Sequence, residues 1–448
     1  MKEVFHAYDI RGKVPEDINP DFAFKLAKAV ATVLKPTNIV VARDNRNSSE
    51  ELSEAIIKSL RSVGVSVVDI GLASTPQFYF SLITSYADGG IMITASHNPK
   101  EFNGFKICGP KAEAIFSENK LPEIKKVFEE ENFIEESDRK GKLMSESINE
   151  KYETHFTKKY RSLSRKFKVL VDTGNSLGII DTNILKKIFG DNLEIDILFE
   201  ELNGDFPYHD ANPVIPKNMD VLMTRLEDKK KDYDLGFAFD GDGDRVVFFL
   251  TGGKMIPPDL ITALIGENIA QKGDLVAYEV RTSRLVENYL KEKGIITKKY
   301  RAGSAFMKQY AKKDNAVFVG EKSGHYIYKS TNYTDSPLLT IILILELIDK
   351  KNKSLNELVE PLMTSSTIPE TNYKVDDSDK IINLIKKEFS EDKIEEIDGL
   401  SVYSEKYFFN IRKSNTEELI RLNLEADSDD IVNTILEKIN SIIKSDEE

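Results

Sequence analysis

The chain has 448 residues, 40% hydrophobic and 31% charged, with a formal net charge of −13. This length exceeds what one hydrophobic core supports and predicts about three or four domains. The acidic balance argues against a nucleic-acid or anionic-membrane partner, because either would need a basic surface. The single cysteine, Cys108, excludes internal disulfides and a cysteine zinc cluster, and it suits a reducing compartment.

Neither the start of the chain nor its longest apolar run indicates a membrane protein. The charged residues Lys2 and Glu3 interrupt the start of the chain, so no signal peptide is visible and we expect a cytoplasmic protein. The longest apolar run, 338–345, is too short to span a bilayer. It predicts a buried helix after Pro337 instead.

Strand-like and helix-like stretches alternate through the first three quarters of the chain. A helix is expected to begin near Ser49, which is a capping candidate. The alternation predicts three consecutive α/β units, each with a sheet covered by helices. The expected strands are 38–42, 65–69, 90–94, 168–172, 235–239, 246–250, 274–278 and 316–320.

The last eighty or so residues differ from the preceding units. Short strands are expected at 400–403, 408–411 and 419–424, followed by a terminal helix, which is an α+β pattern. The predicted fold is therefore three α/β domains with mixed sheets between helices, plus a C-terminal helix-flanked sheet domain. The predicted domains are 1–148, 149–250, 251–366 and 367–448, and the predicted linkers are 129–153, 251–254 and 365–372.

The most informative motif is Asp240-Gly-Asp-Gly-Asp-Arg245, between two apolar strand-like runs. Three acids at the end of a buried strand would repel one another unless they converge on a cation. The two glycines allow the tight turn that this convergence needs. Hard carboxylate oxygens favour Mg²⁺ or Ca²⁺ over zinc. The alternative is a solvated acidic hairpin turn, which the flanking apolar runs disfavour.

A second polar loop, Thr94-Ala-Ser-His-Asn-Pro99, follows the apolar strand at 90–94. Ligands sit at the carboxyl ends of strands in open α/β sheets, so Ser96 is a candidate nucleophile or phosphoryl carrier. Lys106 would place an amine nearby. The chain has no glycine-rich nucleotide loop, which favours a covalently held phosphate. By itself the motif is equally typical of a plain turn.

Two later motifs suit a sugar phosphate. Glu321-Lys-Ser-Gly-His325 combines acid, hydroxyl and imidazole, which can hydrogen-bond a polyol. Arg412-Lys-Ser-Asn-Thr416, with Arg421, can hold a phosphate through arginines and backbone N–H groups. Either could also be an exposed polar turn. Arg11 and Arg301 could add positive charge.

Taken in order, these motifs resemble the α-D-phosphohexomutase family, which includes phosphomannomutase/phosphoglucomutase. The resemblance covers essentially the whole chain and implies interconversion of hexose 1-phosphate and hexose 6-phosphate. It implies a phosphoserine and a hexose 1,6-bisphosphate intermediate that reorients, with the bisphosphate also acting as activator. The implied cofactor is Mg²⁺, the implied ligands are small hexose phosphates, and the oligomeric state stays open.

The same resemblance implies a role for each site residue. Ser96 would be the phosphoserine and, with Asp240, Asp242 and Asp244, would complete the Mg²⁺ site. The groups implied around the transferring phosphoryl are Arg11, Lys106 and Arg245, with Lys106 a base if its neighbours lower its pKa. His325, also implied to be catalytic, would lie beside the groups that hold the sugar. The groups implied for the sugar and its non-reacting phosphate are Glu321, Ser323, Arg301, Arg412, Ser414, Asn415, Thr416 and Arg421.

The chain departs from the family pattern at Glu418, where the phosphate loop usually carries proline. Asn415 resembles the mannose/glucose branch, whereas the glucosamine branch more often has glycine there. A phosphoglucosamine mutase, a non-catalytic sugar-phosphate-binding relative and a Mg²⁺ phosphatase are the competing functions.

Overall fold

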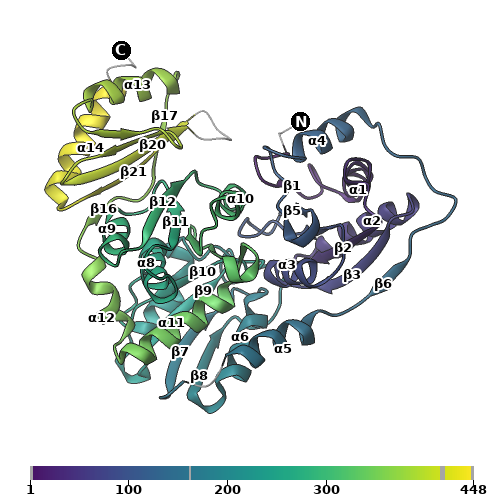
Figure 1. Ribbon diagram of the computed structural model, residues 1–448, viewed down its shortest axis with the longest axis horizontal. Coiled ribbons are helices and arrows are strands. Elements are labelled where there is room, and N and C mark those ends of the chain that lie inside the picture. The colour runs from purple at the N-terminus through teal and green to yellow at the C-terminus, as the bar shows by residue number, and fades with distance from the viewer. Residues whose placement is uncertain (1–3, 161–162, 414–418, 445–448) are drawn as a thin grey trace. The chain divides into compact units, whose positions relative to one another are not determined.

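The computed structural model describes residues 4–160, 163–413 and 419–444. The chain forms two compact units: unit 1 contains Met1–Pro257 and Ser323–Leu355, and unit 2 contains Pro258–Lys322 and Asn356–Glu448. The chain therefore leaves unit 1, returns to it, and ends in unit 2. Figure 1 follows this path from the purple N-terminus to the yellow C-terminus. The predicted domain boundaries at 148, 250 and 366 stay a prediction.

The first sheet of unit 1 is mixed, with strand order β1-β5-β4-β2-β3-β6. Strands β2, β3, β4 and β6 run parallel to one another, whereas β5 is antiparallel to both β4 and β1. The strands are β1 (Ile10–Lys13), β2 (Asn38–Arg43), β3 (Ser66–Leu72), β4 (Gly89–Ile93), β5 (Phe102–Cys108) and β6 (Leu143–Ser145). The helices are α1 (Pro20–Leu34), α2 (Ser49–Ser62), α3 (Thr75–Thr84) and α4 (Leu121–Glu130).

Alternate side chains of β2 enter two different cores, because successive side chains of a strand point to opposite faces. Ile39 and Val41 pack with α1 and α2, whereas Val40 and Ala42 pack with α3. Helices on both faces of the sheet (Figure 1) confirm the predicted α/β arrangement of this part of the chain.

The predicted linker at 129–153 stays a prediction, although the short strand β6 lies within it and pairs in parallel with β3. The helix expected near Ser49 is confirmed, but its predicted cap is wrong. Ser49 is the first residue of α2 and Ser48 stands at the N-cap, where it makes no side-chain capping bond. The Ser49 hydroxyl instead donates to Asp44, so it is part of a buried network.

The second sheet of unit 1 has the strand order β10-β9-β7-β8, parallel except for the β9–β10 hairpin. Every residue of β9 and β10 is buried, as the apolar runs around the acidic motif predict. The strands are β7 (Phe167–Asp172), β8 (Leu193–Leu198), β9 (Leu235–Phe239) and β10 (Val246–Phe249), and the helices are α5 (Asn149–Lys159), α6 (Gly178–Phe189) and α7 (Asp220–Glu227).

The returning segment of unit 1 carries the longest apolar run of the chain. It forms the antiparallel pair β14 (Tyr326–Tyr328) and β15 (Thr334–Asp335), then helix α11 (Pro337–Lys351). Ten residues of α11 are buried, and Ser336 caps it by accepting from the Leu339 N–H. The predicted buried helix after Pro337 is confirmed. No described helix combines the length and apolar character that crossing a bilayer requires.

Unit 2 contains a parallel three-strand arrangement, β12-β11-β13, and a separate antiparallel sheet. The parallel strands are β11 (Leu275–Glu279), β12 (Ile296–Tyr300) and β13 (Phe318–Gly320), with helices α8 (Pro258–Ile269), α9 (Arg284–Glu292) and α10 (Ser304–Asp314). The short helix α12 (Leu355–Val359) precedes the C-terminal sheet.

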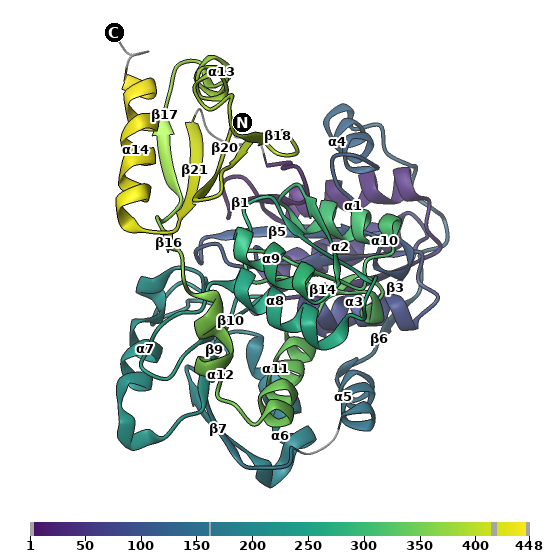
Figure 2. The ribbon, with the colours of Figure 1, turned by 60° about the vertical axis from the view of Figure 1, so that its left-hand side comes forward.

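The C-terminal sheet is antiparallel and has the order β16-β21-β20-β19-β18, with β17 also paired to β21. Its elements are β16 (Ser366–Thr367), β17 (Thr371–Lys374), α13 (Ser378–Glu388), β18 (Lys393–Glu395), β19 (Leu400–Tyr403), β20 (Tyr407–Lys413), β21 (Leu419–Ala426) and α14 (Asp429–Lys444). Helices α13 and α14 lie together against the sheet (Figure 2) and share one apolar core with it. This confirms the predicted α+β domain.

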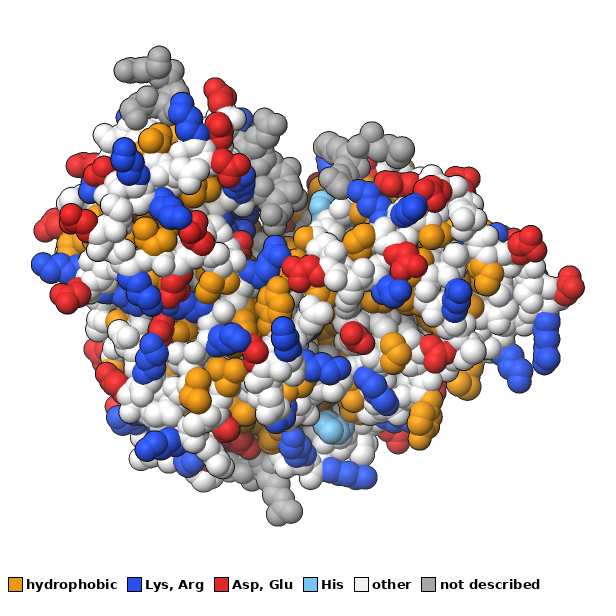
Figure 3. Space-filling model, turned by 45° about the horizontal axis from the view of Figure 1, so that its top comes forward, with side chains coloured by type: hydrophobic (Ala, Val, Ile, Leu, Met, Phe, Trp, Pro, Cys, Tyr) orange, Lys and Arg blue, Asp and Glu red, His pale blue; other side chains and the backbone are white. Residues whose placement is uncertain are grey.

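The surface carries charges of both signs. On the face drawn in Figure 3, acidic and basic side chains are interspersed rather than segregated. Interspersed charges are typical of protein surfaces without a strong single-sign field.

One buried acid should make stability depend on pH. Burial raises the pKa of Asp181, in α6, to about 8 from 3.8, against the opposing effect of the Leu338 N–H. Between those two values the folded state holds a proton that the unfolded state has lost, so stability falls as pH rises. We expect the melting temperature to fall between pH 6 and pH 9 by less in Asp181→Asn than in the unsubstituted protein. Equal slopes would contradict this, and Asp191→Asn, at an exposed position, is the matched control.

Candidate active site

Ser96 lies in the loop between β4 and β5, where its side chain faces the acidic motif. Its Oγ donates to Asp240 Oδ2 at 2.9 Å and lies 3.1 Å from His97 Nδ1. Its backbone φ is +52°, in the left-handed region that non-glycine residues rarely adopt. Burial, reinforced by Arg245 and Arg11, lowers the pKa of His97 well below its ordinary value, so the imidazole beside Ser96 is neutral.

The acidic motif turns between β9 and β10 and brings its three carboxylates together. One oxygen each from Asp240, Asp242 and Asp244 lies within 4.8 Å of the other two, and all three residues are buried. Asp240 Oδ1 accepts from the backbone N–H groups of Asp244 and Arg245, at 3.1 Å each. The hairpin therefore folds the carboxylates inward, as the sequence predicts.

Glycine is required at each of the two glycine positions of this motif for a different reason. Gly243 has a φ of +67°, which glycine adopts without strain. At Gly241 the reason is space, because a Cβ there would lie 2.4 Å from the Ser96 carbonyl oxygen. The absence of a side chain thus lets the acidic motif contact the serine loop directly.

The carboxylates fit a divalent cation. Asp242 Oδ1 is buried and accepts no hydrogen bond, although a buried carboxylate oxygen normally has a donor. Burial, and then repulsion from Asp244 and Asp242, raises the pKa of Asp240 well above its ordinary value. Such a cluster of hard oxygen ligands is stabilised by a cation.

Lys106 lies in strand β5 rather than in a loop, and its ammonium contacts the acidic cluster. Its Nζ is 2.5 Å from Asp242 Oδ2 and 2.5 Å from Asp244 Oδ2. Although burial alone would lower the pKa of Lys106, these two carboxylates raise it far above its ordinary value. The two carboxylates thus favour the charged ammonium, whereas a role as base requires a lowered pKa.

His325 and Arg245 extend the same cluster. Arg245 Nε donates to His325 Nε2 at 3.3 Å, and Asp244 Oδ1 lies 3.2 Å from that nitrogen. His325 Nδ1 is 3.0 Å from Ser323 Oγ. The Arg245 guanidinium and the Asp244 carboxylate therefore both face Nε2, while the Ser323 hydroxyl faces Nδ1.

Arg11 approaches the serine loop from β1. Its Nη1 donates to Asn98 Oδ1 at 2.7 Å and to the Ala95 carbonyl at 3.2 Å, while Asp9 pairs with the same guanidinium at 2.7 Å. Unit 1 thus brings together the predicted residues Ser96, Lys106, Arg11, Arg245, His325, Ser323 and the three aspartates.

In unit 2, arginines gather around one carboxylate, that of Glu370. Arg412 and Arg421 are opposite each other on β20 and β21, and lie 3.6 and 3.5 Å from the Glu370 carboxylate. Arg281 donates to the same carboxylate at 3.1 Å. Two like charges directly opposite on neighbouring strands repel, so the carboxylate compensates a destabilising pair.

A third arginine and two acids link this group to the predicted sugar-binding loop. Arg281 pairs with buried Glu279 at 2.6 Å, and Glu279 also accepts from the Lys322 backbone N–H at 2.7 Å. Glu321, next to Lys322, is buried. The loop after β13 and the arginine group are therefore connected through Glu279.

Some of the predicted binding residues lie in other surroundings than expected, and others lie outside the described residues. Arg301 stacks over the Phe306 ring, 3.9 Å from its centroid, so its role in binding stays a prediction. Arg412 lies within β20 rather than in a loop. The predicted phosphate ligands Ser414, Asn415 and Thr416, and the departure at Glu418, lie outside the described residues.

Sequence reasoning missed three contributors: Arg281, Glu370 and Thr75. Thr75 Oγ1 donates to Asp242 Oδ2 at 2.6 Å from the start of α3. None of the three lies in a recognisable motif. The one available signal was position, since Arg281 lies two residues after β11, and ligands bind at the carboxyl ends of strands in open sheets.

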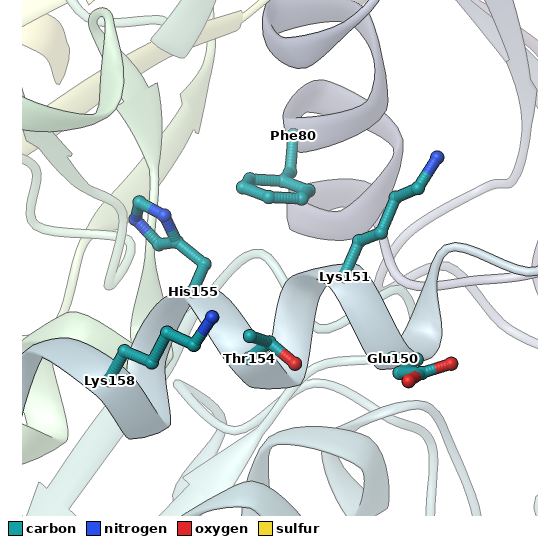
Figure 4. Close-up of a pocket in the computed structure, with 6 residues that line it drawn as sticks. All are labelled: Phe80, Glu150, Lys151, Thr154, His155 and Lys158. Carbon is teal, nitrogen blue, oxygen red and sulfur yellow. The ribbon is translucent and has the colours of Figure 1, made fainter.

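A surface pocket of about 610 Å³ lies apart from these groups. Figure 4 shows it between α3 and α5, lined by Phe80, Glu150, Lys151, Thr154, His155 and Lys158. It contains none of the predicted site residues, and its chemistry is that of an open surface hollow.

Known families match this chain along almost its whole length. The matching domain models are Phosphoglucomutase/phosphomannomutase alpha/beta/alpha domains I, II and III at residues 2–135, 150–253 and 257–365, and the C-terminal domain at 370–442.

Individual relatives agree with these models. A phosphomannomutase of Methanocaldococcus jannaschii is 34% identical over 445 residues, covering 98% of this chain and 97% of that protein. A phosphoglucomutase of Neisseria meningitidis is 31% identical over 456 residues, covering 99% and 97%. A crystal structure of a family protein from Burkholderia thailandensis has a TM-score of 0.91 at 29% identity, covering 100% of this chain and 98% of that one. The chain therefore belongs to the phosphoglucomutase/phosphomannomutase family and is a phosphohexomutase.

Proposed function

We propose that this phosphohexomutase interconverts hexose 1-phosphate and hexose 6-phosphate through a phosphoryl group carried on Ser96. The observation that carries the assignment is the 2.9 Å hydrogen bond from Ser96 Oγ to Asp240 inside the buried acidic cluster. A hydroxyl held against a cation-binding cluster is where a phosphoryl group can be both attached and neutralised.

The cation that fits the cluster is Mg²⁺, with Asp240, Asp242 and Asp244 as its ligands. When bound, it would neutralise the carboxylates and the oxygens of the phosphoryl group. As support from a fold relative, an Aspergillus fumigatus N-acetylphosphoglucosamine mutase structure, 14% identical to this chain, is a complex with GlcNAc-6P and magnesium.

Phosphoryl transfer needs positive charge around the equatorial oxygens and a base for the accepting hydroxyl. Arg11, Lys106 and Arg245 supply the charge. As the bond from phosphorus to Ser96 Oγ breaks, a bond to a sugar hydroxyl oxygen forms, and that hydroxyl loses its proton. We assign the proton acceptor to His325, because Asp244, 3.2 Å from its Nε2, would stabilise the imidazolium that forms.

A single serine can serve both ends of the hexose only if the sugar turns around between two transfers. The intermediate is then a hexose 1,6-bisphosphate, which would also rephosphorylate Ser96 as an activator. The non-reacting phosphate needs a separate grip that accepts either end. Arg412 and Arg421 provide it in unit 2, and Arg412 Nε is a buried donor without a hydrogen-bond acceptor, as an anion site requires.

The sugar hydroxyls are assigned to Glu321 and Ser323. Mannose and glucose phosphates are the favoured substrates, in line with the phosphomannomutase and phosphoglucomutase relatives. Parallel turnover assays with mannose 1-phosphate, glucose 1-phosphate and glucosamine 1-phosphate test this choice against phosphoglucosamine mutase. A preference for glucosamine 1-phosphate would overturn it.

Replacing the phosphoryl carrier should abolish turnover. We expect Ser96→Ala to lose activity and to lose the phosphate that intact mass and peptide mapping find at Ser96 in active protein. Full activity in this variant, or active protein without phosphate at Ser96, would contradict the assignment. Ser390→Ala, at an exposed position in unit 2, should retain both activity and phosphate.

Removing one carboxylate should separate activity from stability. Asp240→Asn should lose several kcal/mol of transition-state stabilisation, at least about 100-fold in kcat. Without metal its melting temperature should stay equal or rise, because repulsion within the buried cluster falls. Calorimetry with and without Mg²⁺, and turnover in EDTA, measure both. Unchanged turnover of the original protein in excess EDTA would refute the metal assignment, and Asp220→Asn is the exposed-acid control.

The remote phosphate grip should matter in both directions of the reaction. Arg421→Ala should weaken binding of hexose 1-phosphate and hexose 6-phosphate alike, by about 1.5–3 kcal/mol or roughly 10- to 150-fold. Mg²⁺ affinity should not change. Forward and reverse kinetics decide, with exposed Arg225→Ala as control. A binding defect in one direction alone would mean that another group holds the phosphate in one of the two poses.

A further inference from the structure

One buried arginine outside the motifs contacts the serine loop along its whole length. Arg46 follows β2, and its side chain is 0% exposed. Its two terminal nitrogens donate four hydrogen bonds, all to backbone carbonyls of the segment 96–102. The acceptors are the carbonyls of Ser96 at 2.9 Å, Asn98 at 2.7 Å, Pro99 at 2.7 Å and Phe102 at 2.9 Å.

These four bonds use every N–H of the two terminal nitrogens of the guanidinium. The third nitrogen, Nε, lies 3.2 Å from Asp44 Oδ2, and the guanidinium stacks over Phe206 at 5.2 Å from the ring centroid. Asp44 is held in turn by the Ser49 hydroxyl and the Arg46 backbone N–H. These contacts at its edges and on its ring-facing side hold the Arg46 guanidinium in place.

The loop that Arg46 contacts needs an external constraint. A non-glycine residue with a φ of +52°, as Ser96 has, persists only where its surroundings over-determine it. Buried backbone carbonyls must find donors, and the Pro99 carbonyl receives one from the Phe102 N–H as well as from Arg46. Arg46 supplies these donors at both ends of the loop, so it sets the direction in which the Ser96 hydroxyl points.

We propose that Arg46 is a positioning residue for phosphoryl transfer, which holds the Ser96 loop so that Oγ faces the acidic cluster. The inference rests on the proposed role of Ser96. Arg46 touches neither sugar nor phosphate, so it acts on the transfer step and leaves the grip on the substrate unchanged. A misplacement of about 1 Å at a reacting group can cost about 100-fold in rate.

The test is steady-state kinetics of Arg46→Ala and Arg46→Lys in the full-length protein, with phosphate at Ser96 measured by intact mass. We expect kcat of Arg46→Ala to fall about 100-fold while KM stays within about twofold. Arg46→Lys keeps the charge but cannot reach all four carbonyls, so its kcat should lie between that of Arg46→Ala and that of the original protein. Arg43→Ala, at the end of β2 three residues before Arg46 and paired with Glu50, is the control and should match the original protein.

Chemical rescue separates positioning from a purely structural role. Millimolar guanidinium chloride should enter the space left in Arg46→Ala and restore most of the lost kcat, whereas sodium chloride should not. Unchanged kcat in Arg46→Ala, or losses in both variants that appear in KM and are not rescued, would overturn the proposal. If Arg46→Ala fails to fold, a kcat of Arg46→Lys equal to that of the original protein overturns it. Failure of the serine assignment itself would appear instead as activity in Ser96→Ala.

Discussion

Three buried carboxylates that face one another are the constraint on which the rest of unit 1 depends. Burying three carboxylates together is costly unless positive charge or hydrogen-bond donors compensate them. Part of the compensation comes from distant parts of the chain, through Lys106 of β5 and the Thr75 hydroxyl, and part comes from Arg245 in the hairpin itself. The domain around the first sheet must therefore place β5 and α3 next to the β9–β10 hairpin of the second sheet.

Unit 2 shows the same physics with the opposite sign. There, the excess charge is positive, because three arginines converge, and the Glu370 carboxylate partly compensates them. A cluster with excess negative charge is suited to a cation, and one with excess positive charge to an anion. Each unit thus holds an internal counter-ion where a charged ligand would also be stabilised.

Much of this arrangement was predictable from local patterns. Apolar runs around the acidic motif predicted a buried hairpin, and the alternation of strands and helices predicted the α/β class, because both signals act over a few neighbouring residues. The direction of the pKa shift of Lys106 was not predictable, because it depends on carboxylates about 140 residues away in the sequence. Arg281 and Glu370 were missed for the same reason: single charged residues carry no local signal until the sheet places them.

The Ser96 carbonyl shows most clearly why motifs alone do not define the site. On one side it accepts from Arg46, and on another the backbone at Gly241 approaches so closely that a Cβ would lie 2.4 Å away. Any side chain at Gly241 would push this carbonyl, and with it the rest of Ser96, out of place. The glycine of the acidic motif is therefore required by the backbone of the serine loop. Arg46, which belongs to neither motif, donates to the same carbonyl. Two motifs and one residue outside them act as one unit, because all three meet at the same backbone oxygen.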